Sequence, residues 1–246
     1  MLLEQNHLVG NSPRESSQRM DHNNGKYSLL KKIRDPISCL THMAGAGAAL
    51  VCTVALVYQA CPYGPGYVFP MLVFGLSLVL LYSASTAYHM PYAQEKTLRI
   101  LRRIDHSMIF CFIAGTYTPV CLIALQGTEG LVMLIVVWSL AIAGCLMKIF
   151  WLQAPRFVST IIYVAMGWIV LFAFYPLAKA VPASSLALLV AGGIAYTTGA
   201  VVYATKRPRL KDGSAFGFHE IFHIFVLIGS FFHILFMFRL IPSHSY

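Results

Sequence analysis

The feature that most constrains this chain is a series of seven apolar segments, each long enough to cross a bilayer as a helix, which takes about 20 residues. Hydrophobic residues make up 58% of the 246-residue chain and charged residues 11%, and the mean hydropathy is +0.68. The alternating pattern of barrel strands is absent. The sequence therefore predicts an all-α integral membrane protein, a seven-transmembrane helix bundle, with spans near residues 37–58, 67–89, 104–125, 130–151, 157–178, 184–204 and 216–238.

The basic residues predict the orientation of these segments. Of the 18 Lys and Arg residues, all but Lys179 and Arg239 precede the first segment or lie at the loops on one side of the membrane. Because positive loops stay inside, the N-terminus is predicted to be cytoplasmic and the C-terminus external. The net charge of +9 is thus a topology signal and a possible contact with anionic headgroups, not a nucleic-acid footprint.

The segment before the first apolar run has a different composition. Residues 1–35 are polar, and the first 26 are rich in Ser, Asn and Gln without an apolar h-region, so we expect a disordered cytoplasmic tail and not a signal peptide. The seven-helix domain is expected over residues 36–246. The six cysteines are scattered without a C-x-x-C pair, which argues against a disulfide framework or a cysteine metal site.

The last apolar segment carries ionisable groups that a membrane helix normally avoids. His219 and His223 are four residues apart, so they share one helix face with Cβ atoms roughly 5–6 Å apart. Two imidazoles at this spacing can bind one metal ion, and polar residues within a span are functional candidates by default. The alternative is a pair of histidines that hydrogen-bond to neighbouring helices.

A third histidine is predicted at the same depth. Alternating topology places the end of the second segment, with His89, beside the start of the seventh, with His219 and His223. Three neutral imidazoles with an open fourth position are the usual form of a catalytic zinc site. We therefore predict a zinc site held by His89, His219 and His223 near the cytoplasmic face.

Two further polar residues are predicted beside this site. Asp105 opens the third segment at the same membrane face, and Ser85 lies one helical turn from His89 on the same face. A carboxylate near a metal is suited to hydrogen-bond the reacting water or a ligand histidine. Asp105 and Ser85 are accordingly the candidate catalytic residues.

The remaining histidines of the spans receive other roles. His233 lies ~21 Å along the helix from His219, at 1.5 Å per residue, so it cannot share the metal and is expected to hydrogen-bond within the bundle. His42 is interpreted as a satisfied packing residue. The sequence around Glu220 also spells H-E-I-F-H, the zinc-protease pattern, in which the Glu is the general base; an intramembrane protease is the resulting alternative.

Helix irregularities are also predicted. Pro119 removes a hydrogen bond to the carbonyl of Gly115, so a bend is expected in the third segment. The connecting residues 92–103 are amphipathic and basic and are expected to lie along the inner membrane surface. The fourth to sixth segments carry aromatic and hydroxyl groups that suit packing or a cavity lining.

Several stretches resemble the hemolysin III family, the bacterial branch of the progestin and adipoQ receptor family, within a superfamily that includes alkaline ceramidases. The likeness runs from about residue 35 to 238. It implies seven helices, a cytoplasmic N-terminus and a zinc bound by His89, His219 and His223, with Asp105 and Ser85 beside it. The matching stretches are STAYH at 85–89, RRIDHSMIF at 102–110, AGTYTP at 114–119, FGFHEIFH at 216–223 and GSFFH at 229–233.

Three functions follow as hypotheses. The first is a zinc-dependent hydrolase of lipid amides or esters, ceramidase-like and involved in membrane-lipid homeostasis, with a membrane lipid as substrate in the bundle cavity. The second is a receptor-like or regulatory protein with structural zinc. The third is a pore-forming haemolysin. In each case the chain is expected in the cell membrane as a multi-pass protein.

Overall fold

A computed structural model describes residues 32–151, 155–208 and 216–242, and within these ranges it contains helices and no strand. The expected tail over residues 1–35 falls almost wholly outside them. Seven helical spans are long and apolar enough to cross a membrane, which confirms the predicted all-α, multi-pass membrane architecture. They run Pro36–Tyr63, Pro65–His89, Glu95–Leu125, Gly127–Phe150, Arg156–Ala180, Ala183–Thr205 and Phe218–Leu240.

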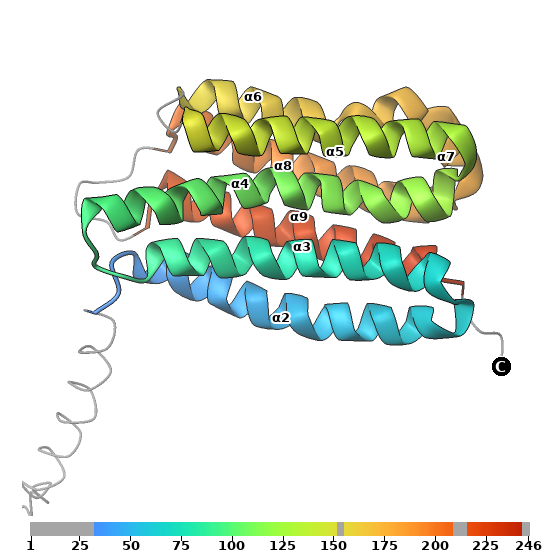
Figure 1. Ribbon diagram of the computed structural model, residues 1–246, viewed down its shortest axis with the longest axis horizontal. Coiled ribbons are helices and arrows are strands. Elements are labelled where there is room, and N and C mark those ends of the chain that lie inside the picture. Colours follow the sequence, from blue (N-terminus) through green and yellow to red (C-terminus); the bar gives the residue numbers. More distant parts are fainter. Residues whose placement is uncertain (1–31, 152–154, 209–215, 243–246) are drawn as a thin grey trace, which may run out of the picture.

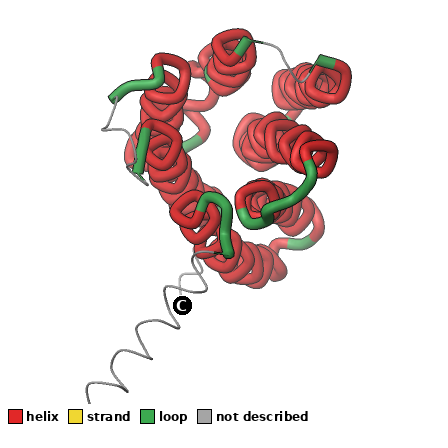
Figure 2. The backbone as a smooth tube through the Cα atoms, turned by 90° about the vertical axis from the view of Figure 1, so that its left-hand side faces the viewer, coloured by secondary structure: helices red, strands yellow, loops and turns green. Residues whose placement is uncertain are grey.

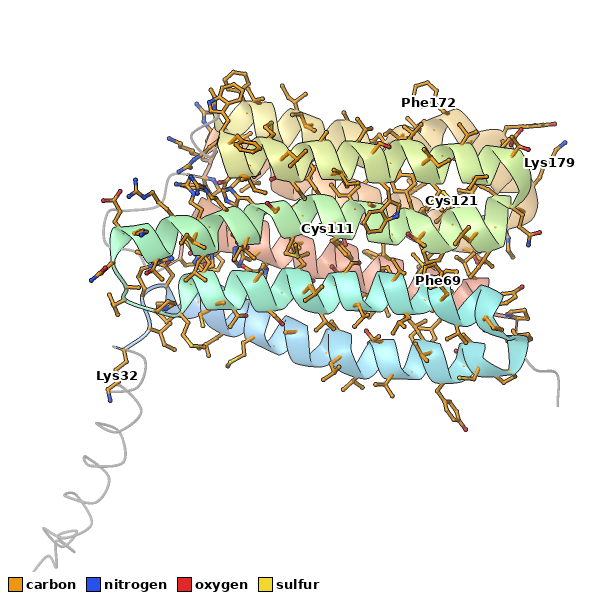
Figure 3. All side chains as sticks on the ribbon, in the orientation of Figure 1. Lys32, Phe69, Cys111, Cys121, Phe172 and Lys179 are labelled. Atoms are coloured by element: carbon orange, nitrogen blue, oxygen red, sulfur yellow. The ribbon has the colours of Figure 1, made fainter. Side chains whose placement is uncertain are left out.

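The helices lie side by side along one direction (Figure 1), and the view down the bundle shows them around a common centre (Figure 2). α2 (Pro36–Ala60) packs on α3 (Pro65–His89) and on α9 (Phe218–Leu240), which in turn packs on α8 (Ala183–Thr205). α4 (Glu95–Pro119) joins α3 to the remaining helices, α5 (Gly127–Phe150) and α6 (Arg156–Gly167). Large apolar side chains such as Phe69 and Phe172 face outward, as expected of a lipid-facing surface (Figure 3).

The third span begins earlier than predicted. α4 starts at Glu95 and continues without interruption to Pro119, so the prediction of a separate surface segment over residues 92–103 was wrong. Residues 95–103 are mostly good helix formers, and no Gly or Pro interrupts them. The first turn also carries an exposed ion pair, Glu95–Arg99, at 3.9 Å. This extension brings basic side chains of α4 to the end of the bundle.

The predicted irregularity near Pro119 takes the form of a change in helix type. α4 gives way directly after Pro119 to a π-helical stretch, Val120–Leu125. Proline cannot donate to the carbonyl four residues back, and a π-turn is one way in which membrane helices accommodate that loss. The span then ends at Gln126, which has φ 46°.

The fifth span is broken where the sequence predicted one helix over residues 157–178. α6 ends at Gly167, a 3-10 stretch covers Ile169–Ala173, and α7 covers Phe174–Ala180. The hydroxyl of Tyr117 on α4 lies 2.9 Å from the Met166 carbonyl and 2.8 Å from that of Gly167, and it accepts the Val170 N–H at 2.9 Å. A buried tyrosine thus satisfies the backbone groups that the break would otherwise leave unpaired in the bundle.

The close contact between α2 and α3 depends on Gly75, a glycine within α3. A Cβ atom at Gly75 would lie 2.4 Å from both γ atoms of Thr53 and 2.7 Å from its Cβ, whereas a Cβ atom at Gly47 would meet no atom of the described residues within 4 Å. Because the Thr53 Cβ is fixed to the backbone, the two helices would have to separate to admit a side chain at position 75.

We therefore expect Gly75→Ala to lower thermal stability, by about 1–3 kcal/mol, the usual cost of overpacking. Gly47→Ala is the matched control, and it should leave stability unchanged or raise it slightly through helix propensity. Thermal unfolding of both variants in one detergent, followed by loss of the monodisperse gel-filtration peak, tests this. Equal midpoints for the two variants would contradict the close contact.

Candidate metal centre

The structure brings the three predicted histidines together at one end of the bundle, where α3 ends and α4 and α9 begin (Figure 1). His89 is the last residue of α3, which stops just before Pro91. His219 and His223 lie in the first two turns of α9, which begins after Gly217. The Glu220 carboxylate accepts the Gly217 N–H at 2.8 Å and so caps this helix.

The three rings present nitrogens that fit one tetrahedral metal. One ligand atom from each of His89, His219 and His223 lies within 4.8 Å of the other two. The Nε2 atoms of His89 and His219 are 3.2 Å apart. Two nitrogens bound to zinc at ~2.0–2.1 Å with tetrahedral angles would lie roughly 3.3–3.4 Å apart. His89 and His223 are also almost completely buried. The three imidazole donors and the distances between their nitrogens therefore fit a zinc site.

Asp35 orients His89, a role that the sequence analysis missed. Its carboxylate lies 2.9 Å from His89 Nδ1 and its backbone N–H donates to the His89 carbonyl at 3.1 Å. A carboxylate can only accept, so the proton of a neutral His89 ring belongs on Nδ1 and leaves Nε2 free for a metal. Partial burial alone would raise the pKa of Asp35, but hydrogen bonds from His89 and Arg34 outweigh burial and hold it below its ordinary value.

The role of Asp35 could not be read from the sequence pattern. Asp35 stands directly before Pro36, the first residue of the predicted seven-helix domain, and this position indicates only where a helix begins. The contact with His89 joins positions 54 apart, and it depends on the backbone pairing of Arg34 and Asp35 with the end of α3. Such pairing outside the helices leaves no periodic signature, so the sequence pattern alone did not indicate it.

His42 packs against the ligand set but is not a satisfied histidine. It is 3% exposed, and its ring stacks on that of His223 with centroids 3.7 Å apart and planes at 13°. Neither ring nitrogen makes a hydrogen bond of normal geometry with any residue that the structure describes. The prediction of a packing role agrees with this contact, whereas the expectation of hydrogen-bonded nitrogens was wrong. The stacking restricts the orientation of the His223 ring.

Glu220 is placed for a structural role. One carboxylate oxygen accepts the Ser38 hydroxyl at 2.9 Å, and the other accepts the Gly217 N–H. Both oxygens are thus engaged in joining α9 to α2 and in capping α9. This arrangement does not present a general base to the three histidines, and it argues against the protease interpretation of the H-E-I-F-H sequence.

Asp105 and Ser85 form a pair on neighbouring helices. Both side chains are buried, and the Ser85 hydroxyl lies close enough to the Asp105 carboxylate to stabilise its charge. Among the described residues, no hydrogen bond links Asp105 to a candidate ligand histidine; its nearest imidazole contact is His106 Nε2 at 4.0 Å. Orientation of a ligand ring therefore falls to Asp35, while the Ser85–Asp105 pair lines a cavity with His219 and His223.

This cavity extends from the histidines into the bundle. Its volume is about 190 Å³, and mostly apolar side chains line it, among them Leu81, Phe112 and Val226. His233 also lines the cavity, and its ring packs edge-to-face against that of Tyr196 with centroids 5.2 Å apart. It is not part of the group of three candidate ligand histidines. Within the described part of the chain, the ring nitrogens of His233 lack the hydrogen bonds of normal geometry that the sequence analysis expected.

Comparison with known proteins identifies the family. Residues 30–234 match the family model described as Haemolysin-III related. The chain is 38% identical to the Hemolysin-3 homolog of Bacillus subtilis over 212 residues, which covers 85% of this chain and 96% of that protein. It is 36% identical to Hemolysin-3 of Bacillus cereus over 203 residues, covering 81% and 89%. The chain therefore belongs to the Haemolysin-III related family.

Proposed function

We propose that this protein is a zinc-dependent hydrolase that cleaves an amide or ester bond of a membrane lipid from within the bilayer. The observation that carries the proposal is the convergence of His89, His219 and His223 beside a cavity that also holds the Ser85–Asp105 pair. The donor set and spacing fit zinc. A zinc ion at such a site polarises a carbonyl group and lowers the pKa of a water molecule.

The protein groups supply the remaining chemistry. Asp105 accepts the proton of the attacking water and can return it to the departing amine or alcohol, while the Ser85 hydroxyl fixes the carboxylate by hydrogen bonding. Asp35 holds His89 in the tautomer that binds metal. The apolar cavity takes the acyl chain and excludes bulk water from the reacting bond.

A receptor-like protein with structural zinc is the second candidate, since it would need the same three histidines. A pore-forming role is the third, because the relatives carry the name hemolysin. The three differ in what the Ser85–Asp105 pair does. Only a hydrolase requires a proton acceptor next to the cavity, so the Asp105 experiment below separates the hydrolase from the other two.

The proposed orientation places the N-terminus and the histidines at the cytoplasmic face of the cell membrane. It is supported by the basic residues, of which all but two fall on that side. A reporter fused after Tyr246 is expected to be external, and one inserted after Lys211 cytoplasmic. Accessibility of the two fusions in intact cells checks this, and the opposite pattern would move the site to the outer face.

Zinc binding is expected at about one ion per chain. Ala at His89, His219 or His223 should each abolish it, whereas His233→Ala should retain it because His233 lies outside the ligand group. Asp35→Asn should weaken zinc affinity by roughly 10–100-fold through loss of the carboxylate that orients His89. Metal analysis after dialysis against a graded zinc buffer measures both effects; full zinc content in all three Ala variants would refute the site.

Asp105→Asn is expected to separate catalysis from metal binding. The variant keeps the size of the side chain but cannot accept a proton, so release of fatty acid from a long-chain acyl amide should fall by about 10²–10⁴-fold while zinc remains bound. Glu129→Gln, which removes an exposed carboxylate on α5, is the matched control and should keep full turnover.

Zinc content and fatty-acid release are to be measured together in one lipid-reconstituted preparation. If the wild type releases no more fatty acid than a metal-stripped sample across a panel of amides and esters, the hydrolase proposal fails. In that event, leakage of a dye from the same vesicles would favour the pore, and absence of leakage would favour the receptor-like protein.

A further inference from the structure

Three cationic side chains line the same cavity and belong to no part of the proposed metal chemistry. They are Arg102 on α4, Lys148 on α5 and Arg156 at the start of α6. Within residues 32–151, 155–208 and 216–242, none of the three forms an ion pair with an Asp or Glu. Nitrogen atoms gather at this end of the bundle (Figure 3). We call Arg102, Lys148 and Arg156 the cationic cluster.

Lys148 is the most informative member because it is buried. Its side chain is 3% exposed, and its ammonium group donates to the Ser159 hydroxyl. An ammonium group has three donors, and this hydroxyl is its one hydrogen-bond partner among the described residues. Its position in the last turn of α5 offers a partial negative charge. A neutral hydroxyl and a helix end compensate only part of the cost of burying a charge.

The three cations lie around shared neighbours. Arg102 and Lys148 are close enough to repel each other, and all three cations interact electrostatically with His106. Arg102 and Arg156 also both interact with Tyr203. The Arg156 guanidinium lies over the Tyr203 ring, 5.4 Å from its centroid. Asp105 is the acidic group near Arg102, and it brings at most one negative charge against three positive ones.

From this arrangement we propose that the cationic cluster is a binding site for a phosphate group, taken from an anionic lipid headgroup at the mouth of the cavity. Guanidinium groups bind phosphate through paired hydrogen bonds, and a buried lysine supplies a point charge. The hydroxyls of Thr160 and Tyr203, which also line the cavity, can donate to the remaining phosphate oxygens.

The geometry of the cavity favours a lipid over free phosphate. Its polar end holds the cationic cluster, while apolar side chains such as Leu81, Phe112 and Val190 line the rest. When the headgroup is bound by the cationic cluster, the acyl chains of the same lipid would therefore occupy the apolar part of the cavity. The proposal concerns binding alone and goes beyond the proposed hydrolysis, so it stands whether or not the metal centre turns over a substrate.

The test compares lipid retention by the full-length protein. The wild type and variants are equilibrated with equal amounts of phosphatidylglycerol and phosphatidylcholine of identical chains, and bound lipid is counted by native mass spectrometry. The wild type should favour phosphatidylglycerol by about tenfold or more, and Lys148→Met and Arg156→Gln should each reduce this preference about tenfold. Lys96→Gln, which removes an exposed charge at the start of α4, is the matched control and should keep the preference.

A second arm distinguishes the source of the phosphate. Thermal midpoints are measured with inorganic phosphate and with chloride at equal ionic strength, since salt screens exposed charges. If phosphate stabilises the wild type and Arg156→Gln abolishes this effect, free phosphate also binds the cationic cluster. If the lipid preference is present but phosphate does not stabilise the protein, the acyl chains are required for binding. Either result supports the site.

The proposal is overturned if the wild type shows neither lipid preference nor phosphate stabilisation, or if both persist unchanged in Arg156→Gln. Arg156 is exposed, so its replacement leaves the fold intact even if Lys148→Met disturbs packing. Zinc content is measured on the same samples. Unchanged zinc content in Arg156→Gln, together with loss of lipid preference, would show that the substitution disrupts the cationic cluster and leaves the metal centre intact.

Discussion

The structure depends on how an apolar bundle accommodates several imidazole rings at one end. A buried polar group is costly unless a partner binds it, and His89, His219 and His223 are placed so that a single metal ion can bind all three. The carboxylate of Asp35 fixes the first of these rings, and the ring of His42 covers the third. A metal ion bound there would link the end of α3 to the start of α9, and Asp35 ties the entry to α2 to the same point.

Three acidic residues at this end have separate roles. Asp35 hydrogen-bonds His89, Glu220 caps α9 and holds Ser38, and Asp105 pairs with Ser85 beside the cavity. This separation matters for mechanism, because a carboxylate already engaged in orienting a ligand or capping a helix is a poor proton acceptor. Asp105 is therefore the carboxylate that we propose as the proton acceptor. The cationic cluster then adds a means of holding an anionic headgroup at the same cavity.

The number of spans followed from apolar length, and the convergence of His89 with His219 from alternating topology, which places the end of one span and the start of another at the same membrane face. What the sequence did not indicate depends on contacts between helices. The break after Gly167 is stabilised by a tyrosine on another helix, and the role of Asp35 depends on backbone pairing with the end of α3. The extension of α4 to Glu95 was missed because its basic composition suggested a surface segment.

The central claim is that His89, His219 and His223 bind one zinc ion through ring nitrogens. Zinc-edge X-ray absorption of the purified protein tests it most directly, because the fine structure reports the type, number and distance of the ligands. The account predicts three nitrogen ligands at ~2.0–2.1 Å and one further light atom, with an imidazole scattering pattern. A sulfur shell at ~2.3 Å, or a zinc with six oxygen ligands and no imidazole, would contradict it.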